Sequence, residues 1–307
     1  MGRKRRSIGR DISGVLLLNK PSGVTSNAIL QEIKKIFFAK KAGHTGSLDP
    51  LATGMLPICF GEATKYSHYL LNSDKKYRVT CKLGITTDSA DSDGIIIEEK
   101  EVSEISSKFL QECLDSFLGS SMQTPPMHSA IKVDGEPLYK KAHKGEVVER
   151  EPRNIVIYSF DVVKKSFSEL ILDVHCSKGT YVRTLIEDLG KMLGFGAHVS
   201  GLHRTALSFF SDEEMVTLEE ITECFNRDDK FLSLNNLLLP VGEMTRGFNE
   251  VVLSPDEKFY IKNGQAVRVG NSPETGMVSM YFADKFIGVG LVLEDGRIEP
   301  KRLVKNI

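Results

Sequence analysis

The segment of residues 43–57, GHTGSLDPLATGMLP, constrains this chain more than any other stretch. It holds three glycines, two prolines and one carboxylate, Asp49. Gly46 and Gly54 can adopt backbone angles that other residues avoid, and Pro50 keeps Asp49 out of the helical region. We therefore predict a tight, rigid loop, instead of an ordinary helix or strand, that presents Asp49. Its apolar members are expected to anchor it in a core: Leu48, Leu51, Met55 and Leu56.

Two interpretations of Asp49 are open from these residues alone. An Asp before a Pro in a glycine-rich loop is commonly a turn residue whose side chain bonds nearby backbone amides. A carboxylate on a loop that is anchored in a rigid core is also the usual setting of a catalytic group.

The composition is that of an ordinary soluble globular protein. The chain has 307 residues, of which 41% are apolar and 26% charged, enough for one large domain or a large and a small one. No apolar run approaches the roughly 20 residues that span a bilayer. The basic start is followed by an apolar run of only residues 15–18, too short for a signal peptide. A cytoplasmic location is expected.

The cysteines indicate reduced thiols. Their number is odd and they form no CxxC pair, which argues against a disulfide framework and against a zinc site. We expect all five to be small buried side chains: Cys59, Cys81, Cys113, Cys176 and Cys224.

Charge is distributed unevenly along the chain although the formal net charge is only −1. Residues 1–65 carry a local charge of +7, which includes the basic run at positions 3–6. Residues 211–260 carry a local charge of −8. A basic N-terminal part around the candidate site suits an anionic partner, although basic tails are often merely solvated.

Periodicity predicts alternating strands and helices. A short buried strand begins at Gly14, and a helix over residues 26–39 begins at Thr25 or Ser26. Alternating apolar side chains predict a strand over residues 76–86. The spacing of apolar residues over 104–119 predicts a second amphipathic helix.

The second half continues in the same way. Strands are predicted over residues 155–160 and 170–176, and residues 211–240 are expected to be helical. Between them, an apolar stripe predicts a helix with Thr180 as its N-cap and Gly194 at its end. Arg183 lies in the first turn of this helix, where a positive charge is unfavourable next to the helix dipole. Its presence there therefore indicates a specific interaction. Beyond Pro240, short strands with glycine turns predict a small β module.

The acidic run of residues 88–94, DSADSDG, has the composition of a calcium-binding loop. Aligned as an EF-hand, it puts Ser89 at the first ligand position and Lys100 where the bidentate Glu must stand. The metal hypothesis fails on that position, and we predict a structural turn packed against a sheet.

Several motifs in order resemble the TruB family of tRNA pseudouridine synthases. HTGSLDPLATGMLPICFGEATK is similar to the nucleophile motif of that family, and KPSGVTS to its N-terminal signature. KYRVTCKLG, QTPPMHSAIK and SKGTYVR resemble further family motifs. The resemblance runs from Gly14 to Val304. In the N-terminal signature it implies a structural role for Lys20 and Pro21, which would support the nucleophile loop.

The resemblance implies an α+β fold with two domains. A mixed, mainly antiparallel sheet with flanking helices would form the catalytic domain over residues 1–245. That domain would carry an RNA-binding insertion at about residues 120–153. Residues 246–307 would form a small β-rich PUA domain, an RNA-binding appendage found in this family.

The resemblance also implies roles for individual residues. Asp49 matches the catalytic nucleophile, Arg183 would pair with it and keep it ionised, and Tyr77 would pack against the flipped uracil and act in catalysis. Further residues match positions that contact the substrate: His44, Tyr181 and Leu202. From the residues alone, His44 could equally be a satisfied turn histidine, and Tyr77 a core residue.

The insertion mixes basic side chains with rings, a plausible RNA-contact surface because cations neutralise phosphates and rings stack on bases. The candidate contacts are His128, Lys132, Lys140, Lys141 and Lys144, with His143 also in the run. His128 departs from the family pattern, which has Tyr at this position.

The implied reaction isomerises uridine 55 in the T arm of tRNA to pseudouridine, with tRNA as the partner, no cofactor, no metal and a monomeric enzyme. Two other classes of function are kept as alternatives. One is a non-catalytic RNA-binding or tRNA-folding protein in which Asp49 is a turn residue. The other is a metal-dependent hydrolase that uses His44, Asp49 and the acids of residues 88–94.

Overall fold

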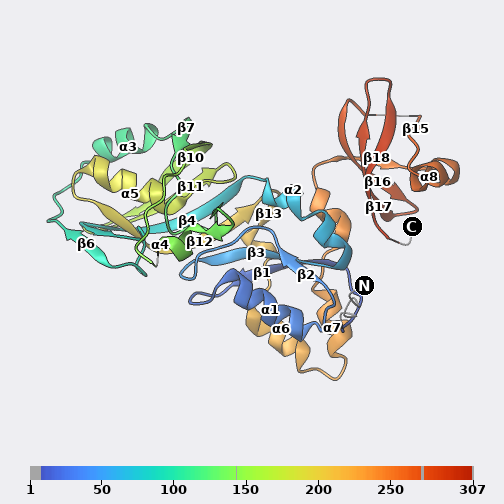
Figure 1. Cartoon of the computed structure of the whole chain (residues 1–307), viewed down its shortest axis with the longest axis horizontal. Coiled ribbons are helices and arrows are strands. Elements are labelled where there is room, and N and C mark those ends of the chain that lie inside the picture. The colour runs from blue at the N-terminus through green and yellow to red at the C-terminus, as the bar shows by residue number, and fades with distance from the viewer. Residues whose placement is uncertain (1–7, 143, 271–272, 306–307) are drawn as a thin grey trace.

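The computed structural model describes residues 8–142, 144–270 and 273–305. The predictions for the basic run at positions 3–6 and for His143 lie outside these residues. Within them the chain forms one large and one smaller sheet with flanking helices (Figure 1), which confirms the predicted α+β class. No helix of the described part is both long and apolar enough to cross a membrane.

The large sheet has nine strands, and its main order is β1-β3-β12-β4-β11-β10-β7, with β2 on β3 and β13 on β12. In chain order these strands are β1 (Gly14–Lys20), β2 (Ala42–His44), β3 (Thr53–Phe60), β4 (Lys75–Leu83), β7 (Gly119–Gln123), β10 (Arg153–Lys165), β11 (Glu169–Cys176), β12 (Ala197–Leu207) and β13 (Phe210–Ser211). Only β3 and β12 pair in parallel among them. The sheet is therefore mixed and mainly antiparallel, as predicted.

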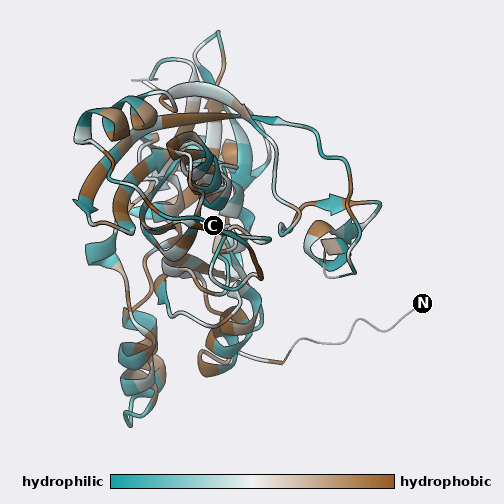
Figure 2. Ribbon diagram, turned by 90° about the vertical axis from the view of Figure 1, so that its left-hand side faces the viewer, coloured by the Kyte–Doolittle hydropathy of each residue, from teal (hydrophilic) through white to brown (hydrophobic). Residues whose placement is uncertain are grey.

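The helices flank the large sheet in two groups (Figure 1). α3 (Ser107–Asp115) and α5 (Val182–Leu193) lie together, and α5 packs on β12 and β4. α1 (Ser26–Ile36), α6 (Leu218–Phe225) and α7 (Lys230–Asn236) lie beside β1. In Figure 2 the helices alternate hydrophilic and hydrophobic colours along their turns, as expected for helices with one buried face.

Helix α1 begins where the sequence predicts. The Thr25 hydroxyl accepts a hydrogen bond from the Ala28 amide and caps the helix. Its end comes earlier than predicted, because Phe38 has a left-handed φ of 47° that reverses the chain. The buried stripe of this helix is Ile29, Leu30 and Ile33.

Short elements connect these. They are η1 (Gly61–Lys65), α2 (Ser67–Leu71), η2 (Asp212–Glu214), η3 (Val241–Thr245), the hairpin β5 (Ile85–Thr87) and β6 (Ile96–Glu99), and in the insertion β8 (Lys132–Val133), β9 (Glu136–Pro137) and α4 (Leu138–Ala142). All five cysteines are buried, as predicted.

The C-terminal sheet has the order β14-β16-β17-β18-β15. Its elements are β14 (Asn249–Val252), β15 (Val267–Arg268), β16 (Gly276–Phe282), β17 (Lys285–Val292) and β18 (Arg297–Leu303), with the helix α8 (Pro255–Lys262). The predicted β module is present, but α8 was not predicted. Its signal was the capping box in which Ser254 and Glu257 bond each other's backbone amides.

The C-terminal sheet is fastened to the large one by mixed contacts. The Tyr66 ring packs edge-on against Phe286, with 5.4 Å between centroids, and its hydroxyl donates to the Arg302 carbonyl at 3.2 Å. The Lys305 amide donates to the Glu62 carboxylate at 2.6 Å. Because apolar packing and hydrogen bonds act at one junction, the two sheets hold a fixed relation there.

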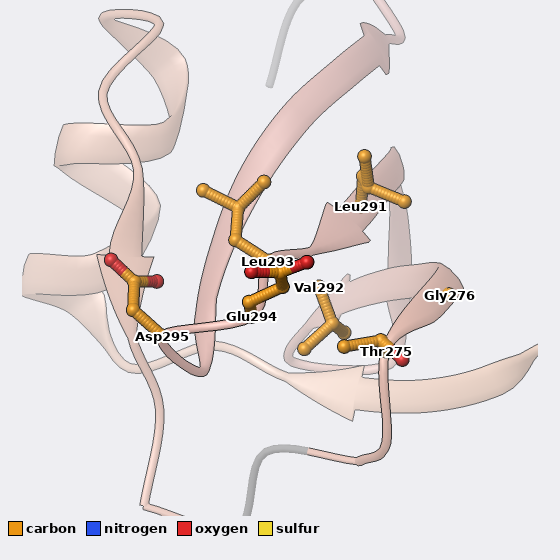
Figure 3. A pocket seen from close by; sticks show the side chains of 7 residues that line it. All are labelled: Thr275, Gly276, Leu291, Val292, Leu293, Glu294 and Asp295. Carbon is orange, nitrogen blue, oxygen red and sulfur yellow. The ribbon is translucent and has the colours of Figure 1, made fainter.

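An open hollow of about 780 Å³ lies on the C-terminal sheet (Figure 3). It is lined by Thr275, Gly276, Leu291, Val292, Leu293, Glu294 and Asp295. Its two carboxylates would repel phosphate, and it contains none of the predicted site residues. The candidate site lies instead on the large sheet.

Candidate active site

The loop that carries Asp49 connects two strands of the large sheet. The prediction that residues 43–57 form no ordinary strand was wrong at both ends, because β2 includes His44 and β3 begins at Thr53. Between them, Gly46 has a φ of 104°. Gly54 has a φ of 94°, and a Cβ there would lie 2.4 Å from the Arg204 carbonyl oxygen, so this crossing needs glycine.

The loop is anchored as predicted. Leu48, Met55 and Leu56 are buried, and Leu51 packs against the main core. The Ser26 hydroxyl of α1 bonds the backbone of Leu48 on both its amide and its carbonyl. Asp49 is thereby held on a rigid loop.

The carboxylate of Asp49 meets the guanidinium of Arg183, 134 residues further on. Arg183 Nε lies 2.9 Å from Asp49 Oδ2, and Nη2 donates to Oδ1 at 3.1 Å. The carboxylate is thus held by one hydrogen bond, from Nη2, and by a close ionic contact with Nε. The Arg183 side chain is 4% exposed and that of Asp49 is 36% exposed, so the acid faces the open side of the pair.

Arg183 also joins two further segments to the site. Its Nη1 donates to the Ser89 carbonyl at 3.0 Å and lies 3.3 Å from Asp91 Oδ2. Its Nη2 donates to the His128 carbonyl at 2.7 Å, which brings the insertion to the same guanidinium. One buried cation thus links the loop that carries Asp49, the acidic turn and the segment around His128.

Asp91 was missed by sequence reasoning. The run of residues 88–94 is the structural turn that was predicted, and it closes on its own side chains. The Ser89 hydroxyl donates to Asp91 Oδ1 at 2.5 Å, and the Asp93 amide donates to the same oxygen at 3.1 Å. The remaining oxygen of this buried carboxylate faces Arg183. A short-residue turn built around one central acid was the available signal.

The described residues contain no group of three or more His, Cys, Asp or Glu side chains arranged to hold a metal ion. The hypothesis of a metal-dependent hydrolase therefore finds no donor set in that part of the chain.

Opposing influences act on the Asp49 carboxyl. Burial raises its pKa above the ordinary value of an aspartate, and Arg183 acts in the opposite direction. The neighbouring Asp91 charge raises the pKa of Asp49 further, and Lys20 lowers it. The site thus holds a carboxylate with a costly negative charge beside two cations.

Lys20 supports the loop from below. Its fully buried ammonium donates to the carbonyls of Pro21, Pro50 and Ala52 at 2.9, 3.1 and 2.6 Å. Three carbonyls match the three donors of an ammonium group. The predicted structural role of the KPSGVTS segment is borne out, because two of these bonds hold the loop at Pro50 and Ala52, directly after Asp49.

Replacing Lys20 by Met is expected to lower turnover on the order of tenfold or more, because the loop loses its support. Burial lowers the pKa of Lys20 to about 8, below its ordinary 10.5. From pH 8 to 10.5 the unfolded chain holds this proton and the folded chain does not, so rising pH favours folding through this group. Urea unfolding at pH 7 and pH 10 measures the free energy of unfolding of wild type and of Lys20→Met. The amount by which wild type is more stable should be larger at pH 10 than at pH 7. A constant or shrinking advantage contradicts the assignment.

Two of the predicted substrate residues, Tyr77 and Tyr181, lie close enough to Asp49 for its charge to raise the pKa of their phenols. Tyr77 lies near the start of β4. Burial raises the pKa of its phenol, and the Asp49 charge raises it further. Tyr181 feels the charges of both Asp49 and Arg183. Leu202 is buried on β12, opposite Val79 of β4.

His44 ends β2, just before the loop. Burial, together with the Arg204 charge, lowers the pKa of this imidazole below its ordinary value. The ring is therefore neutral at pH 7. Its buried Nδ1 has no hydrogen-bond partner among the described residues, so the reading as a satisfied turn histidine is not supported.

The start of α5 differs from the prediction. The N-cap is Tyr181 and not Thr180, whose hydroxyl donates to the Ser177 carbonyl. The side chain of Gln123, from β7, bonds the Tyr181 backbone twice: it accepts from the amide at 2.8 Å and donates to the carbonyl at 3.1 Å. The Gln123 side chain thus holds the N-cap residue itself, and the helix start has no side-chain cap. Gly194 ends the helix in a left-handed conformation, as predicted.

The insertion residues divide into two groups. His128 reaches the site through its backbone carbonyl. Lys132, Lys140 and Lys144 are exposed and Lys141 is half-buried, all within or next to β8 and α4. Lys144 pairs with Glu136 at 2.9 Å.

The fold is shared with solved structures. A chain in the crystal structure of a Cbf5-Nop10-Gar1 complex superposes with a TM-score of 0.73 and 24% identity, covering 94% of this chain and 84% of the other. At this identity the match establishes the fold alone.

Sequence comparisons identify the family. A model of the N-terminal domain of TruB family pseudouridylate synthases matches residues 34–182. Models of a tRNA pseudouridylate synthase B C-terminal domain and of the pseudouridine synthase II TruB C-terminus match residues 183–245 and 249–304. Proteins named tRNA pseudouridine synthase B from Yersinia enterocolitica and Pectobacterium atrosepticum are each 50% identical over 99% of this chain, and over 94% and 98% of their own lengths. The chain belongs to the TruB family of pseudouridine synthases.

Proposed function

We propose that this chain is a tRNA pseudouridine synthase that isomerises uridine 55 in the T arm of tRNA. The observation that carries the proposal is the partly exposed Asp49 carboxylate, held on a rigid loop in the fork of a buried arginine. The relatives named tRNA pseudouridine synthase B match this chain over 94% and 98% of their own lengths, which supports tRNA as the substrate class. The position within tRNA rests on the family resemblance.

The reaction breaks the bond between N1 and C1′ of the uridine and joins C5 to C1′. The proton on C5 is released and N1 gains a proton, so no atom is added to the nucleoside. Asp49 either attacks C1′ as a nucleophile and holds the sugar covalently while the base turns, or takes the C2′ proton as the N1–C1′ bond breaks to give a glycal, and returns that proton when C5 joins C1′. Both routes need an ionised carboxylate.

The neighbours of Asp49 suit supporting roles. Arg183 keeps the acid ionised through its opposite charge. A base reaches such a site only when it is extruded from the RNA, and Tyr77 offers a ring against which it can pack. The neutral His44 ring is suited to fill the gap left in the RNA. Tyr181 and Leu202 complete the proposed uridine pocket.

The proposed domain boundary falls between residues 245 and 246. The large sheet and its helices precede it, and the five-stranded sheet follows it. Two family models also meet near this point, one ending at residue 245 and the next beginning at 249. We assign residues 246–307 to a PUA-like RNA-binding domain, and residues 120–153 to the RNA-binding insertion. A monomeric, cytoplasmic enzyme without a cofactor completes the proposal.

The insertion lysines give a prediction about RNA binding. Replacing Lys132 or Lys140 by Gln is expected to weaken tRNA binding and to reduce the slope of log Kd against log salt by about one for each lost phosphate contact. Turnover at saturating tRNA should change little. Filter binding over a salt series measures the slope, with Lys108→Gln, 87% exposed on α3, as the matched control. An unchanged slope rejects these two lysines as RNA contacts.

The proposed function is tested by tritium release from a T-arm hairpin labelled at C5 of its uridines. Wild type should release tritium and Asp49→Ala should release none while still binding the hairpin. If both bind tightly and neither releases tritium, the chain is a non-catalytic RNA-binding or tRNA-folding protein. If a chelator abolishes the activity of wild type, the enzyme depends on a metal ion and the proposed mechanism is wrong.

A further inference from the structure

Arg204, on β12, is a buried cation that the proposed chemistry does not yet use. Its side chain is 1% exposed, the largest fully buried side chain of the described residues. Within the described ranges no carboxylate lies at ion-pair distance from it, and its side chain donates to the carbonyl oxygens of Met55 and Gly46. A buried charge without a counter-charge is costly, so its retention here calls for a local reason.

The guanidinium of Arg204 touches the loop around Asp49 on both sides. Its Nε donates to the Met55 carbonyl at 2.6 Å, and its Nη2 lies 3.4 Å from the Gly46 carbonyl. One residue thus joins the chain that enters the loop to the chain that leaves it. The backbone of Arg204 also lies against Gly54, where a Cβ would meet it.

The same guanidinium acts on Tyr77. The two residues are directly opposed in the antiparallel pair of β12 and β4, so their side chains lie on one face of the sheet. Burial raises the pKa of the Tyr77 phenol, and the Arg204 charge acts in the opposite direction. A guanidinium has only donors, so it can meet the phenol only at its oxygen and leaves the proton of the hydroxyl to another acceptor. The Asp49 charge raises the pKa of the same phenol, so Tyr77 lies within the electrostatic reach of the proposed nucleophile.

We propose that Arg204 is a positioning residue that aims the Tyr77 hydroxyl toward the uridine and keeps it in register with the Asp49 loop. Arg204 acts through Tyr77 and the two loop carbonyls and does not itself meet the substrate. This inference rests on the proposed function, because the Tyr77 hydroxyl needs a direction only if a uridine base binds beside it.

A double-mutant cycle in the hairpin tritium-release assay tests the inference. Single-turnover rates are measured for wild type, Arg204→Met, Tyr77→Phe and the double variant. Each single change is expected to lower the rate on the order of 10²-fold, as lost positioning does. The double variant should lose much less than the product of the two single losses, because without the Tyr77 hydroxyl only the contacts of Arg204 to the loop carbonyls remain to be lost. Hairpin Kd, measured in the Asp49→Ala background to stop turnover, should be unchanged by Arg204→Met.

Control variants separate this role from a general one in folding. Arg78→Met, next to Tyr77 on β4 but with a 52% exposed side chain, should keep wild-type rates. Thermal unfolding checks that each variant is folded. If Arg204→Met does not fold, the cycle is run with Arg204→Lys, which keeps the charge but loses the planar fork, and the same non-additivity is expected.

The inference is overturned if the two rate losses multiply in the double variant, if Arg204→Met matches wild type, or if its loss lies in Kd alone. Failure of the proposed function is a distinct result, because then wild type itself releases no tritium.

Discussion

Asp49→Asn is expected to abolish pseudouridine formation without lowering the temperature of unfolding or the affinity for tRNA. The amide has nearly the shape of the carboxylate but neither its charge nor its nucleophilicity, so neither route at C1′ remains open. Burial raises the pKa of Asp49 in the folded chain above its unfolded value. Its ionised form therefore opposes folding above that raised pKa, and removing the charge relieves the fold.

The measurements are tritium release, hairpin binding and thermal unfolding at pH 7. Asp173→Asn serves as control, because this exposed acid pairs with Arg78 on the strand surface and should leave activity intact. In wild type, the same raised pKa should put the acid limb of the pH–rate profile above the ordinary range of an aspartate. Turnover by Asp49→Asn, or a strongly lowered unfolding temperature, would show that Asp49 is a structural turn residue.

The nucleophile loop was predictable because its constraints are local. Glycine and proline fix the backbone around Asp49 wherever the loop lies in the fold, and Leu48 and Met55 mark the side that must be buried. The cap of α1 at Thr25 is local in the same way. The contact between Asp49 and Arg183 was expected only from family resemblance, since no spacing rule joins residues 134 positions apart.

The missed features depend on tertiary contacts. Gln123, from β7, bonds the backbone of Tyr181, which lies 58 positions away in the sequence, and the N-cap expected at Thr180 was wrong. Asp91 becomes the second counter-charge of Arg183 only once its turn packs on β12. In the sequence, Arg204 is indistinguishable from an ordinary polar residue of a strand. Only the fold shows that it lies opposite Tyr77 and bonds a loop carbonyl.

Arg183→Met is expected to damage both catalysis and stability. It leaves Asp49 and Asp91 as neighbouring negative charges with no guanidinium between them, and it frees the Ser89 and His128 carbonyls. Breaking a buried pair on one side typically costs 3–5 kcal/mol, and we expect about 3 kcal/mol because Asp49 is partly exposed. Turnover should fall on the order of 10³-fold, since Asp49 loses both its direction and the cation that favours its charge.

Urea unfolding and single-turnover tritium release measure the two effects of Arg183→Met, and a second change separates them. Adding Asp49→Asn to Arg183→Met removes one of the two facing charges, so it should recover part of the lost stability and none of the activity. Lowering the pH should also narrow the stability gap to wild type, because protonation removes the same repulsion. Arg183→Lys keeps the charge without the fork and should retain more stability than Arg183→Met. If Arg183→Met is as stable as wild type at pH 7, the guanidinium does not hold these carboxylates together, and the rigid loop alone must fix Asp49.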